Sequence, residues 1–139
     1  MNFTVGVPDD TAFSLTAVFR TDAFTPDSGI ASDCTHLSSI YSAILNAEEG
    51  FADDDVSTAE WTSIVDQAAN DLTNLTATSS GLIGQQLPAV LTEIAGPNAV
   101  PGKLLAHEPL NDSDAARDII GQACAGNGTP LAITADYGG

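Results

Sequence analysis

Residues 57–78, STAEWTSIVDQAANDLTNLTAT, contain the strongest fold signal in the chain. Ser57 and Glu60 have the spacing of a capping box, in which each side chain accepts a hydrogen bond from the other's free backbone N–H at a helix start. Apolar residues then recur on one helical face: Trp61, Ile64, Val65, Ala68, Leu72 and Leu75. The stretch predicts an amphipathic helix that buries this face, with Trp61 as a core anchor.

Three further stretches around it have the period of a helix. One begins at Asp33, where Ser32 or Asp33 can cap it, and reaches Gly50. Another runs from Leu82 to Ala95 and contains Pro88, which should kink or divide it. After a loop over residues 98–110, the last begins near residues 112–113 and ends at Gly126. Their apolar stripes are Leu37, Ile40, Tyr41, Ile44 and Leu45; Leu82, Ile83, Leu87, Val90, Leu91 and Ile94; and Ala116, Ile119, Ile120 and Ala123. The pattern predicts a mainly α fold, a four-helix bundle over residues 31–139.

Both ends of the chain alternate with a period of two, which is typical of a strand with one buried face. Residues 1–30 contain two such runs, separated by a Pro-Asp-Asp turn and followed by a linker over residues 25–29. They predict an extended N-terminal arm or a β-hairpin. The alternating residues are Phe3, Val5 and Val7, then Phe13, Leu15, Ala17 and Phe19, and finally Leu131, Ile133, Ala135 and Tyr137. The last set predicts a short C-terminal strand, whose pairing with the hairpin would make the fold α+β.

The arm contains four of the five phenylalanines of the chain, Phe3, Phe13, Phe19 and Phe24. So much aromatic surface is expected to be covered, and the edge of a strand offers backbone groups to another chain. We therefore expect these four residues to contact another protein, or a second copy of this chain. The alternative is that the arm packs on its own bundle with the C-terminal strand.

Two cysteines, Cys34 and Cys124, are too far apart in sequence for a local metal motif. Cys34 falls in the first turn of the first predicted helix and Cys124 in the last turn of the fourth. An up-down-up-down bundle brings these two helix ends together, which predicts one disulfide. Two buried free thiols are the alternative. A disulfide implies an oxidising, extracytoplasmic setting.

The charge of the chain narrows the classes of partner. Three Lys and Arg stand against nineteen Asp and Glu, giving a formal net charge of −16. Such a surface repels phosphate backbones, which argues against nucleic-acid binding. The longest apolar runs are far shorter than the roughly 20 residues that cross a bilayer, so no transmembrane helix is expected. An exported protein, a protein from a saline habitat and a structural virion protein all fit this acidity.

Candidate metal ligands occur in two acidic stretches. Oxygen ligands at Asp53, Asp54, Asp55, Ser57 and Glu60 resemble the start of a calcium loop, but the required glycine is missing. We interpret this stretch, and residues 111–114 before the last helix, as helix caps and solvated turns. No metal site is predicted from either.

Catalytic motifs are equally sparse. His36 and His107 are the only histidines, and each is interpreted as an ordinary surface or loop residue. The chain has no nucleophile elbow, no phosphate-binding glycine loop and no zinc helix. We therefore expect no enzymatic activity and no cofactor.

Two stretches carry a resemblance to a known group of proteins. DCTHLSSIYSAIL (residues 33–45) opens the first helix with a cysteine, and GQACAGNGTPL (residues 121–131) closes the last with another. Around an acidic, alanine-rich bundle, this layout resembles small exported proteins of mycolic-acid actinobacteria such as corynebacterial porin B. The resemblance implies a compact, disulfide-bridged bundle at the outer cell envelope; the N-terminal arm does not belong to it.

These observations lead to three functional hypotheses. The first is a non-enzymatic domain of the cell envelope or surface that binds another protein. The second is a pore-forming envelope protein, which the resemblance implies. The third is a structural virion protein whose N-terminal arm contacts neighbouring subunits.

Overall fold

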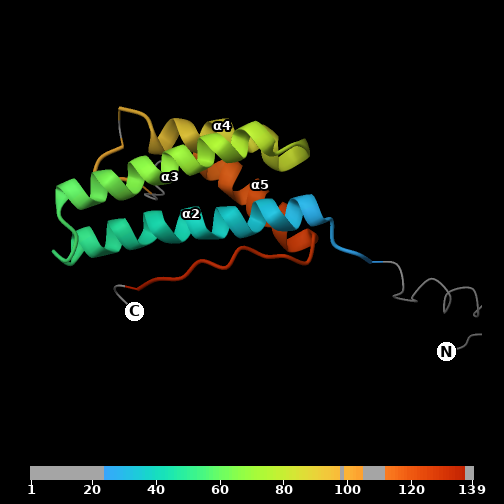
Figure 1. The fold of residues 1–139 in the computed structure, drawn as a ribbon, viewed down its shortest axis with the longest axis horizontal. Helices are drawn as coiled ribbons and strands as arrows, with labels where there is room; N and C mark the ends of the chain where they lie inside the picture. Colours follow the sequence, from blue (N-terminus) through green and yellow to red (C-terminus); the bar gives the residue numbers. More distant parts are fainter. Residues whose placement is uncertain (1–23, 98, 105–111, 137–139) are drawn as a thin grey trace, which may run out of the picture.

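The computed structural model describes residues 24–97, 99–104 and 112–136. They contain four helices, α2 (Ser28–Ala52), α3 (Thr58–Thr78), α4 (Gly81–Ile94) and α5 (Asp112–Gly126), shown in Figure 1. The prediction of a mainly α fold is confirmed for this part of the chain, in which no residue is assigned to a β-strand. The predicted N-terminal hairpin falls in residues 1–23 and lies outside the described residues.

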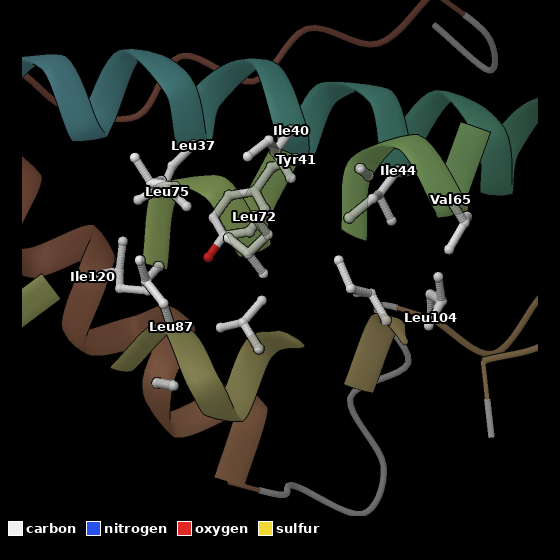
Figure 2. Close-up of a cluster of buried hydrophobic side chains, with 14 of the residues drawn as sticks. Leu37, Ile40, Tyr41, Ile44, Val65, Leu72, Leu75, Leu87, Leu104 and Ile120 are labelled. Atoms are coloured by element: carbon white, nitrogen blue, oxygen red, sulfur yellow. The ribbon is translucent and has the colours of Figure 1, made fainter. Parts of the chain in front are cut away.

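The four helices pack mainly as two pairs. Helix α2 packs on α3, α4 packs on α5, and α3 joins the pairs through α4. Figure 1 shows α2 and α3 side by side and antiparallel, α4 returning along α3, and α5 inclined to the others. One fully buried residue from each helix, Leu37, Leu72, Leu87 and Ile120, contributes to the shared core seen in Figure 2.

The start of α2 differs from the prediction. The helix begins at Ser28, and the Asp27 carboxylate caps it by accepting a hydrogen bond from the N–H of Ile30 at 2.9 Å. The predicted start at Asp33 was therefore wrong, because Ile30 already packs against the core one turn earlier. The residues interpreted as a linker thus include the first two residues of α2, Ser28 and Gly29.

Helix α3 matches its prediction closely. The capping box is present, with the N–H of Glu60 donating to Ser57 Oγ at 3.3 Å and the N–H of Ser57 donating to Glu60 Oε2 at 3.1 Å. Trp61 is 3% exposed, which confirms it as a core residue. Its indole N–H donates to the Glu48 carboxylate of α2 at 2.7 Å, so a hydrogen bond holds Trp61 in place in addition to its apolar packing.

Pro88 does not divide α4, which is continuous from Gly81 to Ile94. The proline is exposed, so its ring faces solvent.

On the next helix, the Arg117 guanidinium contacts the carboxylates of Glu93 and Asp114. The Ser113 hydroxyl also donates to Glu93 at 2.7 Å. The two contacts to Glu93 join α5 to α4, and the contact to Asp114 lies within α5.

The predicted C-terminal strand is wrong for the residues that the structure describes. Residues 131–136 run as an extended segment along α2, but they form no β-ladder within that region (Figure 1). Their partners are side chains of a helix instead of a neighbouring strand. Tyr137, the last residue of the predicted strand, lies outside the described residues.

The core contains one unusual polar group, the hydroxyl of Tyr41. The residue is 5% exposed, and its oxygen has no hydrogen-bond partner among the described residues. Figure 2 shows the ring among apolar side chains of the core. Burial raises the pKa of Tyr41 to about 12, with a smaller opposing effect of Arg117 and a smaller raising effect of Glu93. The hydroxyl is thus desolvated without compensation.

Replacing Tyr41 with Phe keeps the ring and removes only this hydroxyl. We expect the free energy of unfolding of Tyr41→Phe at neutral pH to be unchanged or up to about 1 kcal/mol higher, because no hydrogen bond is lost. At high pH the wild type should lose stability between the unfolded pKa of 10.0 and the folded pKa of about 12, because the unfolded chain releases the phenol proton first. Urea denaturation from pH 7 to 12 measures both effects. A loss of more than about 1 kcal/mol at pH 7 would mean that the hydroxyl has a partner.

Candidate functional site

The predicted disulfide joins the first and the last helix. Cys34 of α2 and Cys124 of α5 are bonded, with 5.8 Å between their Cα atoms and a sequence separation of 90. Both side chains are buried. Because the bond lies near the N-terminus of α2 and in the last turn of α5, it fixes these two helix ends against each other.

A pair of hydrogen bonds reinforces the same end. The N–H of Asp27 donates to Asn127 Oδ1 at 2.8 Å, and Asn127 Nδ2 donates to the carbonyl of Asp27 at 3.1 Å. The chain entering α2 is therefore held beside the chain leaving α5. Asn127 was not singled out from the sequence, although its place just after α5, followed by Gly128 with a φ of +77°, is typical of a helix C-terminus.

An open cleft of about 490 Å³ lies at this disulfide-bridged end. Its apolar lining comes from Ile30, Leu82, Ile83 and Ala123, and its polar lining includes Asp27 and Asp33. Leu82 is 53% exposed, which is high for a leucine beside a core. The cleft thus combines an apolar floor with carboxylates, and we refer to it below as the end cleft.

A second, smaller cleft of about 400 Å³ adjoins the first, since Thr78 lines both. His36 of α2 and Asp71 of α3 lie in its wall. The His36 ring donates from Nδ1 to the carbonyl of Ser32 at 2.9 Å, which leaves Nε2 directed away from its own helix turn. His36 is exposed and Cys34 is buried, so the two lie on different faces of α2. His107 lies outside the described residues.

The acidic residues suggested as calcium ligands form helix ends. Asp53 is the C-terminal cap of α2, Asp54 has a φ of 63°, and the N–H of Asp55 donates to the carbonyl of Gly50 at 2.8 Å. Glu60 accepts from Ser57, which holds the pKa of its carboxyl below the usual 4.5. Among the described residues, no group of three His, Cys, Asp or Glu side chains is placed to hold a metal ion.

The C-terminal segment Leu131–Asp136, which we call the tail, binds along a polar stripe of α2. The N–H groups of Ala132 and Thr134 donate to Ser38 Oγ and Ser42 Oγ, both at 2.9 Å. The N–H of Asp136 donates to the Asn46 side chain at 2.6 Å, and Asn46 Nδ2 donates back to the carbonyl of Thr134 at 3.2 Å.

This regular pairing follows from two backbone periods. Two residues of an extended chain span about 6.6 Å, and four residues of an α-helix rise about 6 Å. Alternate N–H groups of the tail therefore meet side chains at i, i+4 and i+8 of the helix. The next position on the stripe is Gly50, which has no side chain to accept a bond. The stripe Ser38, Ser42, Asn46 is visible in the sequence, but it was not identified as a binding surface.

Of the four phenylalanines predicted to contact a partner, only Phe24 is described. It is 65% exposed. Its ring lies close to Gly128, where an added Cβ would stand 3.3 Å from the ring. Phe3, Phe13 and Phe19 lie outside the described residues, so their role stays a prediction.

Comparisons with known proteins give no relative. No protein-family model, no curated protein and no solved structure matches the chain. No helix within the described ranges has the length and apolar character needed to cross a membrane.

Removing the disulfide should cost much of the stability of this end. Opening a loop of this length raises the conformational entropy of the unfolded chain, which lowers the free energy of the unfolded state by about 4.6 kcal/mol. We expect the double variant Cys34→Ala/Cys124→Ala to lose about 4–5 kcal/mol of unfolding free energy relative to the oxidised wild type. Urea denaturation measures it, with reduced wild type as the control that keeps both sulfur atoms. A loss below about 1 kcal/mol would show that the bridge constrains little.

The Glu60 carboxylate should stabilise α3 only when it is ionised. Since its folded pKa is lowered, its contribution is present above the unfolded value of 4.5 and is lost as the pH falls through the folded pKa. We expect Glu60→Ala to lower the melting temperature at pH 7 and to have little effect near pH 2. Asp66→Ala, an exposed carboxylate on the same helix, controls for the change in net charge. Equal effects of Glu60→Ala at both pH values would contradict this account.

Proposed function

We propose that this chain is a non-enzymatic, extracytoplasmic domain of the cell envelope or surface that binds another protein through its end cleft. The observation that carries the proposal is the exposed apolar surface of Leu82 in the end cleft, which Ile30 and Ala123 also line beside two carboxylates. Protein interfaces combine an apolar centre with a polar rim in this way. The partner places an apolar side chain against this apolar lining, and a neighbouring Lys or Arg of the partner lies beside Asp27 and Asp33.

The charge of the chain supports a cationic partner. A net charge of −16 attracts positively charged surfaces over a Debye length of about 10 Å at 0.1 M salt. Complementary charge speeds encounter and excludes partners of the same sign. The partner class is therefore a protein that presents an apolar residue next to basic ones.

The disulfide supports the extracytoplasmic setting. Disulfides persist in oxidising compartments and are rare where thiol reductants dominate. Trapping of free thiols with a maleimide at the moment of cell lysis tests this, and cell fractionation tests the location. An oxidised protein in the envelope fraction is expected. A reduced protein in the cytosol would contradict the setting, and recovery from virions would favour the virion function.

Site-specific photo-cross-linking tests the binding site. A photoreactive residue in place of Leu82, in the cells that make the protein, should give one discrete cross-linked protein whose yield falls in high salt. Ser63 is an exposed residue of α3 outside both clefts and is the control position. Absence of a product at Leu82, or the same product from Ser63, would contradict the proposal.

A further inference from the structure

The two clefts are parts of one surface along the α2–α3 pair. They meet at Thr78, which lines both. On α2 the lining extends from Gly29 to Ile40, which is about 16 Å of helix. On α3 it extends back from Thr78 to Asp71, because the two helices are antiparallel (Figure 1). We call this continuous surface, made of the end cleft and the second cleft, the long groove.

Three carboxylates line the long groove, Asp27 and Asp33 in the end cleft and Asp71 in the second cleft. Each of them accepts a hydrogen bond from a neutral donor nearby. In the described part of the chain none of the three forms an ion pair, and no Lys or Arg lines either cleft. The negative charges are thus held in place without being neutralised, which favours a cationic occupant.

The spacing of these charges sets a length for the occupant. The Ser79 hydroxyl is bonded to Asp33, and Asp71 precedes Ser79 by eight residues along α3. The carboxylates of Asp33 and Asp71 are therefore separated by about 12 Å along the groove. On a helix that lies in the groove, two basic residues seven or eight positions apart match this separation.

The walls of the long groove favour a helix over an extended peptide. They are themselves helices, whose backbone groups are bonded internally except at the helix ends. An extended backbone needs partners from outside, as the tail shows by binding three polar side chains at i, i+4 and i+8 of α2. No such row of three polar side chains is found among the residues that line the long groove. A helix needs none, because it satisfies its own backbone.

We propose that the long groove binds a basic amphipathic helix of the partner protein. The inference rests on the proposed function, since it names the segment that the end cleft receives and extends the site to the second cleft. In helix-in-groove recognition the apolar face of the helix lies against the groove. Here that face contacts Leu82 and Ile30, and Lys or Arg residues two turns apart lie beside Asp33 and Asp71.

The chain itself supplies no such helix among its described residues. Lys103 lies in a loop, and Arg117 of α5 already contacts Glu93 and Asp114. Residues 1–23 contain one arginine against three aspartates, so this segment is acidic as well. A second copy of the chain, which also carries a net charge of −16, is therefore a poorer occupant than a basic partner.

An NMR titration of the full, oxidised chain with a synthetic peptide tests the inference. The probe is an amphipathic Leu/Lys helix of about 15 residues, a length at which an isolated helix begins to be stable. The amide signals of Leu82 and Ala123 should shift together with those of Asp71 and Asn74, and the affinity should fall with added salt. The same peptide with a central proline, or with Glu in place of Lys, should not bind.

Asp71→Asn removes the charge at the far end of the long groove and keeps an oxygen that can accept from Gln67. It should weaken the affinity for the Leu/Lys peptide about two- to fivefold, as expected for one exposed ion pair. Asp66→Asn is the matched control, because Asp66 is an exposed carboxylate of α3 that lines neither cleft. It should leave the affinity unchanged.

The possible failures are distinguishable. Shifts confined to the end cleft, with equal affinities of the two variants, would overturn the inference and leave the proposed function standing. Equal binding of the proline peptide, or shifts centred on residues 53–55, would also overturn it. If the peptide binds as expected but the cross-link at Leu82 captures no protein, the proposed function fails, while the long groove is retained as a surface that binds basic helices.

Discussion

The covalent bond between Cys34 and Cys124 is the constraint on which the arrangement of this chain depends. Helices α2 and α5 share far less surface than α2 and α3 or α4 and α5. Apolar packing therefore joins α2 to α3, α3 to α4 and α4 to α5. The disulfide and the Asp27–Asn127 hydrogen bonds fix how the first and last helices meet. The bond closes a loop of about 90 residues. This closure lowers the conformational entropy of the unfolded chain and raises the free energy of the unfolded state by several kcal/mol.

The end cleft and the position of the tail both follow from this constraint. The end cleft is lined by the start of α2, the end of α3, the start of α4 and the end of α5, so it exists only while these ends are held together. The tail begins at Leu131, seven residues after Cys124, and meets α2 at Ser38, one helical turn after Cys34. The bridge thus sets the register between the tail and the polar stripe, and Ser38 also donates to the carbonyl of Cys34 at 2.7 Å.

The sequence predicted the features that local chemistry determines. The capping box of Ser57 and Glu60 and the apolar stripe from Trp61 predicted α3. The positions of the two cysteines, at the start of the first helix and the end of the last, predicted the disulfide. The sequence did not predict the features that depend on contacts between residues far apart in the chain. The start of α2 lies earlier than predicted because Asp27 is hydrogen-bonded to Asn127 and Ile30 packs against the core. The tail alternates like a strand because it is extended, but a period of two does not reveal that a helix holds its inner edge. The end cleft joins residues from every helix, so no local pattern contains it.

The claim that the bridge organises the molecule is tested most directly by hydrogen exchange of the native protein before and after reduction under folding conditions. Local opening raises exchange only in the segment that loses its constraint. Our account predicts that reduction accelerates exchange of the tail amides of Ala132 and Thr134 and of the last turns of α5, while the α2–α3 interface around Leu72 stays protected. Exchange that is unchanged in the tail, or that rises equally in all four helices, would contradict it.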